Sequence, residues 1–166
     1  MGYRNKTYVI FDADEDMWAY GFMLGWKSRD HIDFDFHDAH DLNTISDRAS
    51  EDTVKRKLRE RFANAKQVVV IVGKKTKNLF RFVRWEIDVA LELNLPIIVA
   101  NLNEKRRMDD DLCPPILKDK DAIHVAFKMK ILKHAMDHFV DRHAKAFAGQ
   151  ARNWYYKDEV YRELGF

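Results

Sequence analysis

The chain has 166 residues, of which 46% are hydrophobic and 34% are charged. This composition excludes disordered and collagen-like proteins and predicts a single domain over residues 1–166. Within it, the strand and helix patterns described below predict a core over 6–148 and a C-terminal extension over 149–166. The net charge of +2 is unevenly spread, because residues 1–50 hold 5 Lys or Arg and 10 Asp or Glu, whereas residues 51–108 hold 14 and 7. The basic run also fits the outer face of an amphipathic helix, so we expect no nucleic-acid partner.

The single cysteine, Cys113, cannot form an internal disulfide or a CxxC metal site, which favours a reducing compartment. The N-terminal residues turn acidic soon after a short apolar stretch, and this pattern matches neither a signal peptide nor a membrane span. We therefore expect a cytoplasmic protein with no membrane partner.

The first half of the chain alternates between strand and helix patterns. Residues 7–11 form a β-branched and aromatic run that ends at acidic residues, which predicts a strand, and aromatic residues at helical spacing over 15–26 predict a helix. Residues 32–37 alternate apolar and polar side chains, as a strand with one solvated face does. Ser50 can cap a helix whose apolar stripe runs over 54–65.

The second half continues this alternation. Residues 67–72 are an almost continuous apolar run, typical of a central parallel strand that is covered on both faces. Apolar spacing over 82–93 predicts a helix, and residues 97–100 and 122–126 predict two more strands. A long amphipathic helix over 131–147 would close the domain. The expected fold class is α/β, a flavodoxin-like three-layer fold with a parallel five-stranded sheet.

Several common site motifs do not occur in the sequence. It contains no GxGxxG or GxxxxGK[ST] stretch and no nucleophile elbow. Paired acids after the first strand are typical of receiver domains, but Gly73 stands where that class needs a phosphoacceptor Asp. The 7 histidines lack the spacing of a metal motif, so we expect solvated or locally hydrogen-bonded histidines and no metal site.

One acidic residue lies in an unusual place. Ligands of parallel α/β folds bind outside the carboxyl ends of the strands, and the segment that leaves the strand over 67–72 runs into the helix over 82–93. Helical spacing places Glu86 of that helix close to its apolar stripe. A carboxylate in this position is either paired, with Arg81 or Arg84 as partner, or kept for a function.

Three stretches of the chain carry a family pattern. They are Phe11-Asp12-Ala13-Asp14-Glu15-Asp16 after the first strand, Val72-Gly73 with Thr76 after the third, and Val83-Arg84-Trp85-Glu86-Ile87 followed by Leu95-Pro96-Ile97-Ile98. Together they resemble the TIR-like family, which includes the TIR proteins of Thoeris antiphage systems and is related to Toll/interleukin-1 receptor domains. The resemblance covers residues 6–101, and the Trp-Glu segment after the Gly-x-x-Thr turn is its most specific part.

The resemblance implies an enzyme that cleaves the nicotinamide–ribose bond of NAD, with NAD as substrate and no further cofactor. The matching catalytic glutamate is Glu86, whose carboxylate would stabilise the oxocarbenium-like state of glycosyl cleavage. The residues whose positions match a substrate-binding role are Phe11, Asp12, Asp14, Trp18, Asp38, His40, Gly73, Thr76, Arg84 and Trp85.

The resemblance also implies partners. The product would be an ADP-ribose-derived signal, cyclic or conjugated, that activates a separate effector protein, and the enzyme would act as a homo-oligomer. The alternative is a non-catalytic TIR-like module for oligomerisation or nucleotide sensing, in which Glu86 pairs with an arginine instead of facing a ribose-sized pocket. The aromatic residues over 153–156 would form an interface or lid, or would cover the core of the domain itself.

Overall fold

The computed structural model describes residues 6–29, 48–142 and 153–166 of the chain. Its strands form one sheet in the order β1-β2-β3-β4-β5, and every neighbouring pair is parallel. The strands are β1 (Thr7–Ile10), β2 (Gln67–Val72), β3 (Ile97–Asn101), β4 (Ala122–Ala126) and β5 (Asn153–Tyr155). The expected α/β class with a parallel five-stranded sheet is confirmed.

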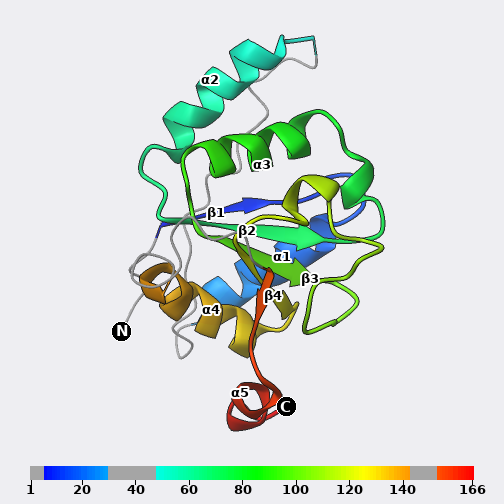
Figure 1. The fold of residues 1–166 in the computed structure, drawn as a ribbon, viewed down its shortest axis with the longest axis vertical. Coiled ribbons are helices and arrows are strands. Elements are labelled where there is room, and N and C mark those ends of the chain that lie inside the picture. Colours follow the sequence, from blue (N-terminus) through cyan, green and yellow to red (C-terminus); the bar gives the residue numbers. More distant parts are fainter. Residues whose placement is uncertain (1–5, 30–47, 143–152) are drawn as a thin grey trace.

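Helices cover both faces of the sheet, as Figure 1 shows. One face carries α2 (Glu51–Phe62) and α3 (Phe82–Glu92), and the other carries α1 (Met17–Lys27) and α4 (Met129–Arg142). The remaining helices are short: η2 (Thr76–Asn78) after β2, η3 (Pro115–Leu117) between β3 and β4, and α5 (Asp158–Glu163) near the C-terminus. The predicted three-layer arrangement is therefore also confirmed.

Each face of the sheet has its own hydrophobic core, because successive side chains of a strand point to opposite faces. In β1, Val9 packs on the side of α1 and α4, whereas Tyr8 and Ile10 pack on the side of α2 and α3. Every residue of β2 and β4 is buried, as expected of strands that are covered on both faces. The side chain of Tyr8 is thereby brought under the same helices that carry Glu86 and Arg61.

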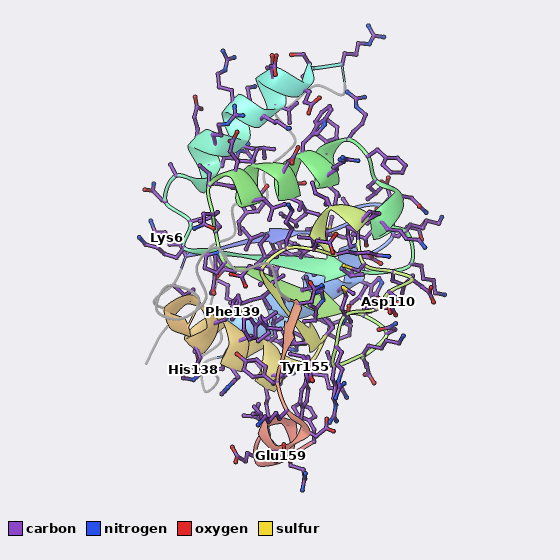
Figure 2. All side chains as sticks on the ribbon, in the orientation of Figure 1. Lys6, Asp110, His138, Phe139, Tyr155 and Glu159 are labelled. Carbon is purple, nitrogen blue, oxygen red and sulfur yellow. The ribbon has the colours of Figure 1, made fainter. Side chains whose placement is uncertain are left out.

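Four strands match predicted segments, and β5 is an additional one. The strand predicted over 32–37 lies outside the described residues. β5 pairs in register with β4, and Tyr161, which follows it, is fully buried in the core. Figure 2 labels Tyr155 and Glu159 along this C-terminal segment, next to the sheet and in α5. Of the aromatic residues over 153–156, Trp154 and Tyr156 therefore help to cover the core of the domain itself, whereas Tyr155 is 46% exposed.

Ser50 caps α2, as its position in the sequence predicts. The Thr53 N–H donates to the Ser50 Oγ at 3.2 Å, and Glu51 and Asp52 occupy the first turn, where the helix dipole favours acidic side chains. We expect Ser50→Ala to lower the free energy of unfolding by about 1 kcal/mol, because the N–H loses its acceptor. Urea denaturation of the two proteins measures this difference, and an unchanged midpoint would show that the cap contributes nothing.

Candidate functional site

A cavity of about 350 Å³ lies at the carboxyl edge of the sheet, among the loops that follow β1, β2 and β3. Its volume suits a small molecule, and parallel α/β folds hold their ligands at this edge. The residues that line it are Glu15, Asp16, Trp18, Gly73, Lys74, Leu102, Asn103 and Leu112. Two of the predicted binding residues, Trp18 and Gly73, therefore meet at one cavity.

Asp16 is the most deeply buried charged group of this cavity, and the sequence analysis did not single it out. Its side chain is 6% exposed, and its Oδ2 atom has no hydrogen-bond partner among the described residues. Burial, together with the carboxylates of Asp12 and Glu15, raises the pKa of Asp16, whereas the Thr76 hydroxyl opposes that rise. A buried acceptor without a partner is suited to receive a hydrogen bond from a ligand.

The turn after β2 is built around Gly73. Its N–H donates to the Thr76 Oγ1 at 2.9 Å, which closes the turn into η2. A Cβ on Gly73 would lie 2.3 Å from the Asp16 Oδ2, so a residue without a Cβ is needed for the carboxylate to pack against this backbone. Gly73 and Thr76, both predicted as binding residues, thus hold Asp16 at the cavity.

The loop after β1 is shaped by Asp12. This side chain is 3% exposed, and its Oδ1 accepts hydrogen bonds from the N–H groups of Asp14 at 3.0 Å and Glu15 at 3.3 Å. Phe11 is buried and stacks on Tyr20 of α1, with ring centroids 4.7 Å apart. Of these three predicted binding residues, Asp12 stabilises the turn, Phe11 lies in the core, and Asp14 is exposed.

Part of the aromatic stripe of α1 faces outward, while Trp26 at its end is partly buried against the core. Trp18 and Phe22 are 54% and 56% exposed, and their rings meet edge to face with centroids 5.9 Å apart. The side chains that α1 buries are those of Ala19, Tyr20 and Met23. Helical spacing groups the aromatic residues on one side of the helix but does not say which side packs. Trp18 also lines the cavity, and an exposed aromatic side chain there can stack on a planar ligand.

Glu86 does not line this cavity. It lies on α3, is 1% exposed, and its Oε2 atom has no hydrogen-bond partner in the part of the chain that the structure describes. Burial raises the pKa of Glu86 to about 8, and the Tyr8 hydroxyl of β1 and the Arg61 guanidinium of α2 act against that rise. Such a carboxyl destabilises a fold, which makes Glu86 a candidate functional group.

Neither Arg81 nor Arg84 is the arginine that acts on Glu86. The Arg81 Nη2 donates to the Ala49 carbonyl at 3.4 Å, and the Arg81 guanidinium lies 5.3 Å from the centroid of the Trp85 ring. Trp85 is half-buried and packs against the core on this face of the sheet. The arginine pairing of the non-catalytic alternative is therefore not formed with Arg81 or Arg84, and the arginine that acts on Glu86 is Arg61 of a different helix.

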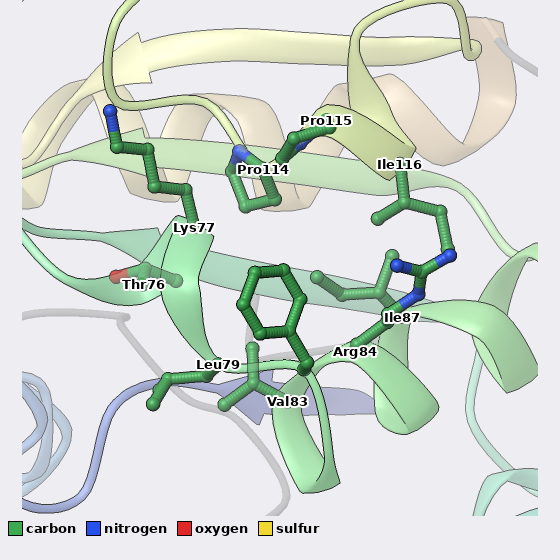
Figure 3. Close-up of a pocket in the computed structure, with 10 residues that line it drawn as sticks. Thr76, Lys77, Leu79, Val83, Arg84, Ile87, Pro114, Pro115 and Ile116 are labelled. Atoms are coloured by element: carbon green, nitrogen blue, oxygen red, sulfur yellow. The ribbon is translucent and has the colours of Figure 1, made fainter.

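Arg84 borders a second, smaller hollow that is shown in Figure 3. In that view the Arg84 side chain lies at one end, near Ile116, and Lys77 lies at the other, beneath the loop of Pro114. The volume of this hollow is about 30 Å³, which is the room of a single water molecule. Arg84 therefore does not face a substrate-sized cavity here.

Two predicted binding residues, Asp38 and His40, lie outside the described residues. Within the described ranges, no group of three or more His, Cys, Asp or Glu side chains is arranged to hold a metal ion. No helix found in those ranges is long and apolar enough to cross a membrane.

The parallel sheet with helices on both faces, the cavity at its carboxyl edge and the buried glutamate on the helix after β2 define a flavodoxin-like domain of the TIR-like class. Comparison with protein families agrees, since the model described as "Thoeris protein ThsB, TIR-like domain" matches residues 8–107. This match spans more than half of the chain and includes Asp16, Gly73 and Glu86. The chain belongs to the ThsB TIR-like family of Thoeris antiphage defence, which confirms the resemblance seen in the sequence.

Proposed function

We propose that this protein cleaves the nicotinamide–ribose bond of NAD, with Glu86 as catalytic residue, and makes an ADP-ribose-derived signal, cyclic or conjugated, for antiphage defence. The observation that carries this proposal is the buried Glu86 carboxyl, whose Oε2 finds no hydrogen-bond partner among the described residues. A fold gains no stability from such a group, so a chemical task is the physical reason for keeping it. Membership of the Thoeris TIR-like family supports the same reaction.

Glu86 would act through its charge. Departure of nicotinamide leaves an oxocarbenium-like ribosyl centre, and an ionised carboxylate beside it stabilises the positive charge. Nicotinamide leaves as a neutral molecule and needs no general acid. Because burial holds the pKa of Glu86 at about 8, a positively charged nicotinamide ring bound next to it would favour the ionised form.

The substrate would reach Glu86 only after the residues that cover it rearrange, because the side chain is 1% exposed. The carboxyl-edge cavity is open to a ligand without such a change. There, Asp16 offers a hydrogen-bond acceptor, Trp18 an aromatic face and Lys74 an ammonium group, which together complement the hydroxyl groups, ring and phosphate of a nucleotide. This cavity supports binding of NAD or of its product.

The proposal includes self-association and a separate effector protein that the product reaches by diffusion. Trp18 and Phe22, which are more than half exposed on α1, support an interface between copies of the chain. The alternative function, a nucleotide-sensing or oligomerisation module without turnover, is favoured by the separation of Glu86 from the cavity at the carboxyl edge.

The test is NAD consumption by the purified full chain at high concentration, with the products identified by mass spectrometry. We expect the wild type to release nicotinamide and Glu86→Gln to lose this activity by about 10²–10³-fold or more, because the ribosyl cation loses its stabilising charge. Glu92→Gln is the matched control, since Glu92 lies on the same helix but is exposed and paired with Arg59 at 2.6 Å. It should keep full activity.

Two results would contradict the enzyme. One is intact NAD after incubation of the wild type with phage lysate or a crowding agent as trigger. The other is equal turnover by the wild type and Glu86→Gln. Binding of intact NAD or ADP-ribose in the first case would establish the sensing module instead.

A further inference from the structure

The carboxyl of Glu86 is approached by groups from two other elements. Tyr8 lies on β1 and is 2% exposed, and Arg61 lies in the last turn of α2. Both act on the Glu86 carboxyl, and burial, followed by the effect of Glu86 itself, raises the pKa of Tyr8 well above its ordinary value. Three segments that are far apart in the sequence thus converge on one buried acid.

The Tyr8 Oη and the Glu86 Oε2 both lack a hydrogen-bond partner among the described residues. Each is a buried oxygen without a hydrogen bond of good geometry to any described residue, and each such oxygen destabilises the fold. One hydrogen bond between them would satisfy both, with the tyrosine hydroxyl donating and the carboxylate accepting. A hydrogen bond to an ionised acceptor is stronger than one between neutral groups, so this contact favours the charged form of Glu86.

The ring of Tyr8 is held in place for such a contact. It packs edge to face against Phe62 of α2, with ring centroids 4.4 Å apart, and it lies in the core between the sheet and the two helices. The Glu86 side chain has more rotatable bonds than the tyrosine ring. Because the two groups already act on each other, rotation of the carboxyl toward the fixed hydroxyl would complete the hydrogen bond.

We propose that Tyr8 is a positioning residue for Glu86: its hydroxyl donates to the ionised carboxylate and, together with Arg61, sets the pH at which Glu86 becomes charged. The inference rests on the proposed function, in which the ionised carboxylate stabilises the ribosyl cation. Among residues 6–29, 48–142 and 153–166, the titratable groups that act on Glu86 are Tyr8 from β1 and Arg61 from α2. On α3 itself, the carboxylate of Asp88 is held by Lys55 at 2.7 Å.

Tyr8→Phe tests this inference with little change in packing, because phenylalanine keeps the ring and its contact with Phe62. Without the hydroxyl, the ionised Glu86 loses a donor, so its ionisation moves up by about one pH unit. We expect NAD turnover at pH 7 to fall about tenfold and to recover as the pH is raised. A purely structural role for Tyr8 would lower kcat by the same factor at every pH.

A second measurement needs no turnover. The stability of the wild type should fall as the pH rises, because the folded protein keeps the Glu86 proton over a range in which the unfolded chain has lost it. In Tyr8→Phe this decline should continue about one pH unit further. Tyr161→Phe is the control: its hydroxyl accepts from the Ala126 N–H at 3.1 Å, so its removal should shift the whole curve without changing its shape.

The outcomes separate this inference from the proposed function. If the stability of Tyr8→Phe continues to fall to a higher pH than that of the wild type, and its pH–activity profile shifts to higher pH, the positioning role is supported. An unchanged shape of the stability curve in Tyr8→Phe overturns it, whether or not the protein cleaves NAD. An extended decline in a protein that leaves NAD intact refutes the enzyme and still supports control of Glu86 ionisation by Tyr8.

Discussion

Glu86→Gln is expected to stabilise the protein by roughly 5 kcal/mol at pH 9 and to change its stability little near pH 5. Burial raises the pKa of Glu86 from 4.5 to about 8, so between these values the folded protein holds a proton that the unfolded chain has released. The stability that the wild type has below pH 4.5 is therefore lost as the pH rises through 8. Glutamine carries no charge to bury, and each pH unit of the interval corresponds to about 1.4 kcal/mol.

Urea denaturation of the wild type and Glu86→Gln from about pH 5 to pH 9 measures the effect. In thermal denaturation at pH 9, the melting temperatures of the two proteins should differ by roughly 10–20 °C, since a domain of this size gains about 2–4 °C per kcal/mol. All other titrating groups are common to both proteins, so their contributions cancel in the difference. Glu92→Gln, the exposed control on α3, should show a flat difference from the wild type over this range. Parallel curves for the wild type and Glu86→Gln would mean that Glu86 titrates normally.

Gly73→Ala is expected to lower the free energy of unfolding by about 1–3 kcal/mol and to displace Asp16 from the carboxyl-edge cavity. The new Cβ would meet the Asp16 Oδ2 at 2.3 Å and its Oδ1 at 2.7 Å, distances that the packed carboxylate cannot accommodate without moving. Asp16 is 6% exposed, so its movement disturbs the packed loops after β1 and β2. Binding of NAD or ADP-ribose in the cavity should weaken together with stability.

The same substitution at another glycine provides the control. Gly25 lies in α1 with no heavy atom within 4 Å of an added Cβ, so Gly25→Ala should stabilise the protein by about 0.5–1 kcal/mol through lower backbone entropy of the unfolded chain. Combining Gly73→Ala with Asp16→Ala removes the collision and should recover most of the loss. If Gly73→Ala behaved like Gly25→Ala in urea denaturation, the close packing of Asp16 against this turn would be refuted.

The buried strands could be predicted because their composition leaves few alternatives. Continuous apolar runs over 67–72 and 97–100 fit strands that are covered on both faces, and β2 and β3 occupy these positions. The same reasoning fails for β5, whose residues Asn153–Tyr155 form a short and partly polar segment. This strand exists because the exposed edge of β4 offers a ladder of unpaired backbone groups.

Part of the candidate site could be predicted from the sequence, and part could not. Helical spacing predicts that Glu86 lies near the apolar stripe of α3, and the structure buries it fully. Sequence reasoning named Asp14 instead of Asp16, because both are acids in one loop and their spacing does not say which one turns inward. The available signal was the combination of Asp16 at the start of a helix with a glycine after the next strand, Gly73.

By itself, the sequence determined the fold class, the order of its main elements and the family, because these depend on local apolar periodicity and on motifs that are contiguous in the chain. Only the tertiary structure decided that Tyr8 and Arg61 act on Glu86, that Asp16 packs against Gly73, and that Trp18 and Phe22 of α1 point outward. Periodicity identifies which side chains share a face. What that face meets depends on contacts between segments that are dozens of residues apart, and such contacts leave no local pattern.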